Sequence, residues 1–264
     1  EAYARMLVEP GGDHPYDVVH TATLRRMHHD HRLTVVGRNR EELAGALAAF
    51  RRDGSAPGVV RGKAAAPASQ KIVFVFPGQG SQWVGMGRQL FRDEPVFRSS
   101  MELCHQSIER LGKFSLLDEL EADEQRSQLG NIHVVQSTIF AIQVSLAALW
   151  RSWGIEPDAV VGHSMGEVAA ARVSGILSLE DAVKVICRRS LALERIVGHG
   201  AMAQVELEAA EAQRAISGFE SVLSVAVHNG PRSTVISGDP HAIDAVLGSL
   251  EARGVFCRRV KVDV

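Results

Sequence analysis

The sequence Asp158-Ala-Val-Val-Gly-His-Ser-Met-Gly-Glu167 is the most informative segment of the chain for its fold class. Its Ala-Val-Val run is typical of a buried strand, and Glu167 to Val173 have the pattern of a helix. Between them, Gly162 and Gly166 frame Ser164 in a Gly-x-Ser-x-Gly turn, which lifts the serine hydroxyl out at the carboxyl end of the strand. The pattern also occurs by chance in loops rich in glycine and serine, but its flanks here predict an α/β fold with Ser164 as a nucleophile.

Two groups near this turn can stabilise an oxyanion. The backbone N–H of Met165 lies at the start of the expected helix, where free N–H groups and the helix dipole favour negative charge. A second apolar run, Lys71-Ile-Val-Phe-Val-Phe76, ends at Pro77-Gly-Gln-Gly80, so we expect the side-chain amide of Gln79 at the same sheet edge as Ser164. This turn could instead hold a phosphate, but it lacks the Lys-Ser/Thr ending of a P-loop and the spacing of a dinucleotide-binding turn.

The expected elements divide the chain into four segments. We expect a small α/β linker unit over residues 1–60, a connecting segment over 61–70, a large α/β-hydrolase-like body with a parallel sheet over 71–199, and a small subdomain over 200–264. In the body, helices are expected at 94–111, 134–153 and 179–197, the last with Ser178 as its N-cap. The last segment has the ferredoxin-like order β-α-β-β-α-β, with elements expected at 201–205, 207–217, 222–227, 234–237, 243–253 and 255–260.

Composition and charge argue against several classes of function. A length of 264 residues with 45% hydrophobic residues is enough for a packed core. The net charge is −2, so we expect no binding of nucleic acid or of an anionic membrane by charge. No apolar run reaches the roughly 20 residues that span a bilayer. The three cysteines are isolated, and the histidines at 28, 29 and 31 lack a ligand pattern, so we expect no disulfide, no metal and a cytoplasmic location.

Three motifs carry a family resemblance. Phe76-Pro-Gly-Gln-Gly-Ser-Gln82, Gly162-His-Ser-Met-Gly-Glu167 and Cys187-Arg-Arg-Ser190, in this order, resemble the acyltransferase domains of type I polyketide synthases, which are relatives of malonyl-CoA:acyl carrier protein transacylases. The resemblance covers nearly all of residues 71–264. The residues before 61 are similar to the adaptor that joins the ketosynthase to the acyltransferase in those synthases. Since the chain also opens on Glu1, we expect it to be a piece of a longer polypeptide.

The resemblance implies a reaction and its partners. Ser164 would take a malonyl or methylmalonyl group from coenzyme A and pass it to the phosphopantetheine thiol of an acyl carrier protein, with no bound cofactor. Arg189 matches the family arginine that pairs with the free carboxylate of the acyl group, although by its sequence alone it reads as a surface residue beside Arg188. His163 and Gln136 match positions lining the family pocket. The neighbouring ketosynthase and other synthase domains would be further partners.

The chain also departs from the family pattern. The general-base histidine of the family follows the last strand of the small subdomain, so we expect it beyond Val264, because none of the 11 histidines of the chain stands in that motif. Ser137 follows Gln136 where the family commonly has proline. Met165 favours malonyl, whereas much of the remaining sequence resembles synthases that use methylmalonyl. The choice between the two extender units therefore stays open.

Two other functions remain possible on the residues alone. An α/β-hydrolase also carries its serine at such an elbow, but it needs an acid and a histidine downstream on one long sheet, where this chain has a small separate unit instead. A structural fragment of a synthase would only hold neighbouring domains together. The presence of Ser164, Gln79 and Arg189 together argues against a degenerate site.

Overall fold

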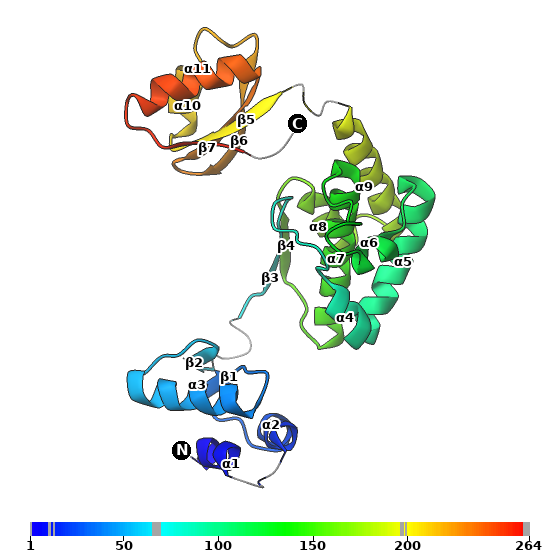
Figure 1. Cartoon of the computed structure of the whole chain (residues 1–264), viewed down its shortest axis with the longest axis vertical. Helices are drawn as coiled ribbons and strands as arrows, with labels where there is room; N and C mark the ends of the chain where they lie inside the picture. Colours follow the sequence, from blue (N-terminus) through cyan, green and yellow to red (C-terminus); the bar gives the residue numbers. More distant parts are fainter. Residues whose placement is uncertain are drawn as a thin grey trace. The chain divides into compact units, whose positions relative to one another are not determined.

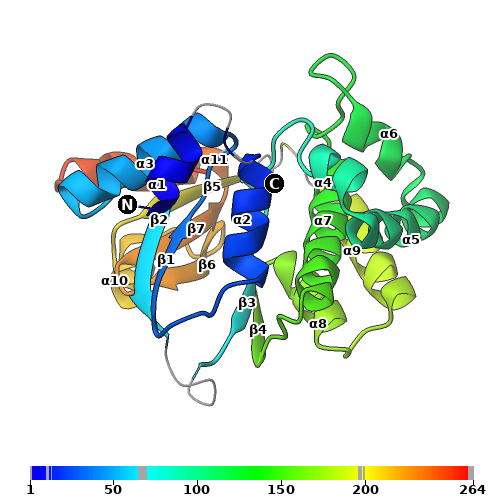
Figure 2. The same cartoon turned by 90° about the horizontal axis from the view of Figure 1, so that it is seen from below.

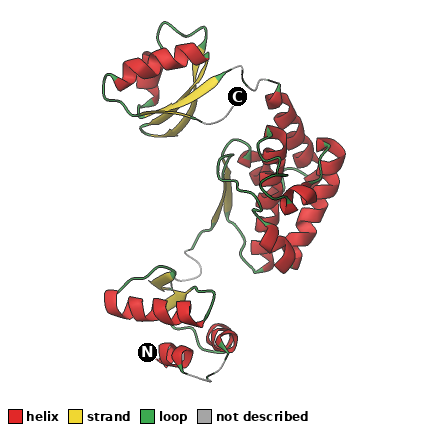
Figure 3. Cartoon of the chain, in the orientation of Figure 1, coloured by secondary structure: helices red, strands yellow, loops and turns green. Residues whose placement is uncertain are grey.

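The computed structural model describes residues 2–9, 12, 14–64, 70–195, 198 and 200–260. The chain divides into two compact units, Glu1–Lys71 and Ile72–Val264. Figure 1 labels the elements, and Figure 3 distinguishes the helices from the strands of each unit. Both units combine helices with strands, so the predicted α/β class is confirmed.

The described residues of the N-terminal unit form a two-stranded sheet with three helices. Strands β1 (His31–Val35) and β2 (Val59–Lys63) pair antiparallel, and the helices are α1 (Ala2–Val8), α2 (Pro15–Leu24) and α3 (Arg40–Asp53). Its core residues are Leu7, Val18, Leu43 and Ala44, with Val35 and Leu47 packed against them. Strand β2 extends to residue 63, so the first residues of the expected connecting segment belong to a strand. The sequence did not indicate this strand, because its pairing with β1 uses backbone groups and needs no apolar alternation. Residues 65–69 of that segment lie outside the described residues.

In the described part of residues 72–198, a parallel strand pair and six helices form the body that begins at Ile72. Strands β3 (Val73–Phe76) and β4 (Ala159–Gly162) pair in parallel, with Phe76 opposite Gly162. The helices are α4 (Arg88–Asp93), α5 (Pro95–Gly112), α6 (Leu116–Glu121), α7 (Ile132–Ser152), α8 (Gly166–Val173) and α9 (Leu179–Glu194). Figure 2 shows α7 between the strand pair and α5. The predicted N-cap of α9 is confirmed, since Ser178 Oγ accepts a hydrogen bond from the backbone N–H of Asp181 at 3.0 Å.

Helix α7 is the central helix of the hydrophobic core of the body. By length and composition it is long and apolar enough to cross a membrane, with a mean hydropathy of 1.6, although polar residues interrupt its apolar run. However, 78% of its most apolar stretch is buried among the neighbouring helices. Its polar residues Gln136, Ser137, Thr138, Gln143 and Ser145 are buried as well. Buried polar side chains are usually hydrogen-bonded, so we expect polar side chains of this core helix to bind polar groups of neighbouring segments.

Residues 200–260 form a sheet with two helices and a core of their own. The elements are β5 (Ala201–Val205), α10 (Ala209–Ala215), β6 (Leu223–Gly230), β7 (Ser233–Gly238), α11 (Pro240–Glu251) and β8 (Cys257–Arg259), in the predicted order. The strands pair antiparallel in the order β6-β7-β5-β8. Both helices contribute to one apolar core with the inner face of the sheet, through residues such as Ala212, Ile236 and Ile243.

Candidate active site

Strands β3 and β4 deliver two turns to one edge of the body. The register places Phe76 opposite Gly162, and the backbone N–H of His163 donates a hydrogen bond to the carbonyl oxygen of Phe76 at 3.0 Å. Because parallel strands end at the same edge of a sheet, the turn that begins at Pro77 and the turn that holds Ser164 leave the sheet together. The predicted convergence of the first two motifs is thus present in the fold.

The Ser164 turn is tight enough to require both of its glycines. A Cβ atom on Gly162 would lie 2.4 Å from the backbone N of Glu167, and one on Gly166 would lie 2.0 Å from the carbonyl oxygen of Phe76. Ser164 itself has φ +53°, a left-handed conformation that non-glycine residues rarely adopt. Helix α8 begins directly after it. The backbone is therefore strained where it holds the exposed Ser164 hydroxyl at the start of a helix.

A chain of side-chain hydrogen bonds joins the three motifs at Ser164. Arg189 on α9 donates from Nη2 to Ser164 Oγ at 3.0 Å and from Nη1 to Gln136 Oε1 at 2.5 Å. Gln136 on α7 then donates from Nε2 to Gln79 Oε1 at 3.3 Å. Four of the residues that the sequence singled out are therefore in direct contact, although they come from two turns and two helices.

Arg189 is half-buried, whereas its neighbour Arg188 is exposed. Desolvation lowers the pKa of the Arg189 guanidinium, and the nearby Glu167 carboxylate opposes this effect. An arginine side chain stays protonated in proteins, so Arg189 is a partly desolvated cation beside the serine hydroxyl. In such surroundings a cation interacts with an anionic group more strongly than it would on an open surface.

The two predicted oxyanion donors are both available. The backbone N–H of Met165 makes no hydrogen bond within the described residues, and it lies where α8 starts. The side chain of Gln79 accepts through Oε1, and within the same described ranges its Nε2 has no acceptor. The side chain of Met165 is 1% exposed and anchors the turn in the core.

The predicted pocket residue His163 is exposed and lies over the neighbouring turn. A Cβ on Gly78 would lie 3.0 Å from His163 Nδ1, so glycine at 78 leaves room for the imidazole ring. Among the described residues, no histidine makes a hydrogen bond to Ser164. A hollow of about 600 Å³ lies between α1 and α3 in the N-terminal unit, and its lining includes none of the site residues.

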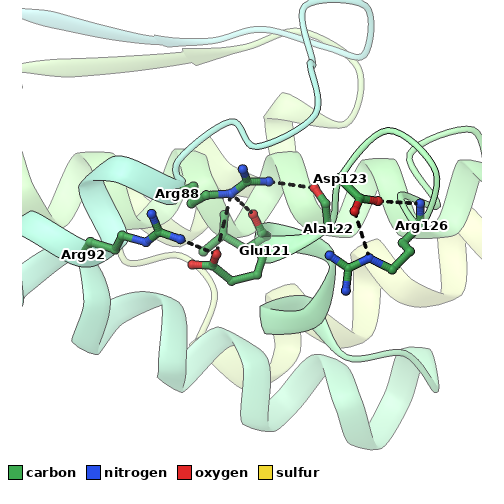
Figure 4. Close-up of polar contacts among 7 residues, drawn as sticks. Arg88, Arg92, Glu121, Ala122, Asp123 and Arg126 are labelled. Atoms are coloured by element: carbon green, nitrogen blue, oxygen red, sulfur yellow. Dashed lines mark hydrogen bonds and ion pairs between the residues drawn. The ribbon is translucent and has the colours of Figure 1, made fainter.

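Polar contacts also anchor the far end of the loop that follows Gln79. Arg88, at the start of α4, donates to the carbonyl oxygens of Leu120 at 3.0 Å and Ala122 at 2.7 Å. Figure 4 shows Arg88 and Arg92 converging on Glu121 at the end of α6. The loop between Pro77 and Arg88 is therefore fixed at its second end by α6.

Sequence reasoning missed one polar contact at the first end of this loop. Gln143 on α7 donates from Nε2 to the carbonyl oxygen of Pro77 at 2.7 Å. The signal for it was its spacing, because Gln143 follows Gln136 by seven residues and so shares its face of the helix.

Comparison with known proteins gives concordant matches. A family model described as acyl transferase domain matches residues 73–264. The chain is 44% identical over 261 residues to the spectinabilin polyketide synthase system protein NorC of Streptomyces orinoci, covering 98% of this chain and 11% of that protein. It is 39% identical over 262 residues to the mycoketide-CoA synthase of Mycobacterium tuberculosis, covering 98% of this chain and 6% of that protein.

Solved structures agree with these matches. The acyltransferase domain from module 8 of the salinomycin polyketide synthase has a TM-score of 0.88 at 39% identity, covering 99% of this chain and 62% of that one. The malonyl CoA-acyl carrier protein transacylase from Coxiella burnetii has a TM-score of 0.65 at 30% identity, covering 74% of this chain and 62% of that one. The chain thus spans less than two thirds of each of these proteins.

Proposed function

Because the chain belongs to the acyl transferase domain family, we propose that it moves a malonyl-type acyl group from coenzyme A to an acyl carrier protein through an ester on Ser164. The observation that carries this proposal is the contact of Arg189 with both Ser164 Oγ and Gln136 Oε1. It puts a cation beside the nucleophile, where the free carboxylate of a malonyl or methylmalonyl group needs a partner. The reaction needs no bound cofactor or metal.

The proposed reaction has two half-reactions. Ser164 Oγ attacks the thioester carbonyl, a C–O bond forms, the C–S bond breaks, and the serine proton ends on the leaving coenzyme A thiol. The phosphopantetheine thiol of the carrier protein then attacks the ester and returns the proton to Ser164. In both steps the N–H of Met165 and the amide of Gln79 would donate to the oxyanion. In this proposal the general base is a histidine that the described residues do not supply.

The acyl group would bind by replacing an existing contact. Gln136 Oε1 now accepts the hydrogen bond of Arg189 Nη1, and a substrate carboxylate oxygen can accept the same bond with a full negative charge. Gln136 would then be free to donate to the carboxylate through Nε2. His163, exposed at the same edge, would border the acyl group.

Two of the similar solved structures support the substrate class. The acyl transferase domain of SpnD, which is 29% identical with a TM-score of 0.82, was solved in complex with a substituted malonyl group. The transacylase from Coxiella burnetii is named for malonyl-CoA. We therefore propose malonyl or methylmalonyl as the acyl group here.

The proposal extends to the architecture and the partners. Residues 71–199 would belong to an α/β-hydrolase-like body, residues 200–264 to a ferredoxin-like subdomain, and residues 1–60 to an adaptor towards a ketosynthase. The strand order β6-β7-β5-β8 supports the second assignment. Because the relatives are much longer synthases, the neighbouring domains and the carrier protein would be the partners, in the cytoplasm.

Intact-mass spectrometry tests the proposal. The chain is mixed with malonyl-CoA or methylmalonyl-CoA, and Ser164→Ala is the control. We expect a mass gain of one acyl group on the wild type alone, and loss of that group when a pantetheine thiol is added. A folded chain that gains no mass with either thioester, even when it is extended by the downstream residues that carry the histidine, would contradict the proposal. Release of free acid to water with no transfer to the thiol would favour a hydrolase instead.

A further inference from the structure

Two glutamines of α7 each contact one residue of the short turn that carries Gln79. Gln136 donates to the Gln79 side chain, and Gln143 donates to the carbonyl oxygen of Pro77. Seven residues correspond to about two helical turns and about 10 Å along the axis, so both side chains project from one face. Helix α7 therefore contacts the turn at its first residue and at its functional residue.

The surroundings of Gln143 are unusual for a residue that serves packing alone. Its side chain is 8% exposed and lies in the core helix, and its Oε1 is buried without a hydrogen-bond partner among the described residues. A buried amide oxygen without a partner costs free energy, which an apolar side chain of similar size would avoid. The hydrogen bond from Nε2 to Pro77 is therefore the feature that distinguishes glutamine at this position.

The carbonyl of Pro77 is well placed to control the turn. It belongs to the first peptide group after β3, and a planar peptide fixes the direction of the Gly78 N–H once its carbonyl is held. The same oxygen would lie 2.9 Å from a Cβ on Gly166, so it also borders the start of α8. Holding this one carbonyl sets the path of the chain towards Gln79 beside the Ser164 turn.

We propose that Gln143 is a positioning residue for acyl transfer, which holds the Pro77 carbonyl and thereby presents Gln79 to the developing oxyanion. This inference rests on the proposed function. Gln143 touches neither the substrate nor the reacting atoms, so its loss displaces an oxyanion donor without removing it. Since oxyanion donors act in the transition state, the rate constant of acylation falls while the half-saturating thioester concentration stays the same.

The test is Gln143→Met, which keeps the length of the side chain and removes its amide. We expect the acylation rate of Ser164 to fall about 10-fold, less than the about 10²- to 10³-fold loss when an oxyanion donor is deleted. The melting temperature should change little, because the variant removes the unpartnered Oε1 but also leaves the Pro77 carbonyl oxygen without its donor, and these two effects oppose each other. A residue with only a structural role would instead lower the melting temperature and the rate together.

Thr138→Val is the matched control. Thr138 lies on the same helix, is 4% exposed, and its Oγ1 is also buried without a partner in the described part of the chain. Within the described residues its hydroxyl makes no hydrogen bond to the turn, so its variant should acylate at the wild-type rate. A Gln143→Met chain that also acylates at the wild-type rate, or that changes only the half-saturating concentration, would overturn the inference.

A second measurement separates this inference from the proposed function. If the wild type is not acylated even with the downstream histidine supplied, the proposed function fails, and positioning is then tested by the NMR chemical shifts of the Gly78 and Gln79 amides. We expect both amide signals to move in Gln143→Met and to stay in place in Thr138→Val, because only the first variant removes the hydrogen bond to the Pro77 carbonyl oxygen. Unchanged signals in Gln143→Met would overturn the positioning role.

Discussion

Arg189 Nη2 lies 3.0 Å from Ser164 Oγ, and the same guanidinium reaches Gln136 Oε1 through its other arm. One planar cation therefore bridges the Ser164 hydroxyl, the proposed nucleophile, and an amide oxygen that a carboxylate can replace. The fork of donors in arginine suits two acceptors at once, which a lysine ammonium cannot reproduce with the same geometry. This geometry makes Arg189 the residue on which acyl selectivity should depend.

Arg189→Ala should slow the transfer of acyl groups that carry a free carboxylate more than the transfer of uncharged acyl groups. We expect kcat/KM for malonyl-CoA to fall about 100-fold, in keeping with the loss of a charge-assisted pair, and kcat/KM for acetyl-CoA to change far less. Acylation rates with the two thioesters measure the difference. Arg188→Ala is the control, because Arg188 is exposed and should affect neither substrate. Equal losses with both thioesters would remove Arg189 from the carboxylate role.

Replacing Ser164 should reveal the strain stored in the turn. Ser164→Gly and Ser164→Ala both abolish acylation, but glycine adopts φ +53° without a Cβ clash, whereas alanine keeps the clash. We expect the glycine variant to be more stable than the alanine variant by about 1 kcal/mol. Chemical denaturation of the two inactive proteins measures this. An alanine variant that is equally stable would argue that the turn relaxes when the hydroxyl is removed.

The sequence was sufficient for the parts of this site that depend on local pattern. The Gly-x-Ser-x-Gly turn needs its glycines because Gly162 and Gly166 contact backbone atoms, and this steric requirement is visible in the motif itself. The N-cap Ser178 follows from hydrogen bonding within one turn of helix. The half-burial of Arg189 could not be predicted in the same way, because it depends on the packing of α9 against α7, which no local pattern encodes.

The missed features depend on contacts between distant segments. Strand β2 is largely exposed and lacks the apolar alternation that would indicate a strand. It forms through its backbone pairing with β1, which lies more than twenty residues earlier in the chain. Gln143 is one polar residue in an apolar helix, and its partner Pro77 lies 66 residues earlier. The ends of the helices also moved by a few residues. Helix α10, for example, is Ala209–Ala215 where 207–217 was expected, since helix ends depend on capping and tertiary contacts.

The cysteines should differ sharply in reactivity. Burial raises the pKa of the Cys104 thiol to about 12, with Arg172 opposing it, and burial also raises the pKa of Cys187. The thiolate is the reactive form, so neither should react with iodoacetamide at pH 8 in the folded chain. Burial and the Glu251 carboxylate also raise the pKa of Cys257, but this thiol is partly exposed and should react first. Mass spectrometry of the alkylated peptides, with and without denaturant, tests this order.

The same pKa shift predicts how stability changes with pH. The pKa of Cys104 is about 12 in the folded chain against an ordinary value of 9.0, so the folded state retains a proton that the unfolded state loses. At a pH below that ordinary pKa, the Cys104 thiol does not affect stability. At a higher pH, this group lowers the free energy of unfolding by about 1.4 kcal/mol per pH unit. Cys104→Ala should show a shallower decline than the wild type. Parallel declines in the two proteins would contradict this assignment.

One substitution should have opposite effects at two glycines of the same unit. Gly166 is the first residue of α8, and a Cβ there would meet the carbonyl oxygen of Phe76 at 2.0 Å, so Gly166→Ala has to push β3 and the Ser164 turn apart. Gly248 is in the interior of α11, and a Cβ there would meet nothing within 4 Å. Alanine is the better helix former by about 1 kcal/mol, so Gly248→Ala should stabilise the chain by about that amount.

Gly166→Ala, in contrast, should destabilise the chain by about 3 kcal/mol or more, because a backbone clash is among the strong causes of destabilisation. It should also slow acylation of any residual folded protein, since the shift moves Ser164 away from Arg189. Urea denaturation of both variants gives the two free energies, and acylation of the folded fraction gives the rate. If Gly166→Ala were as stable and as active as Gly248→Ala, the close approach of β3 to α8 would not exist in solution, and the tight turn would lose its role in aiming Ser164.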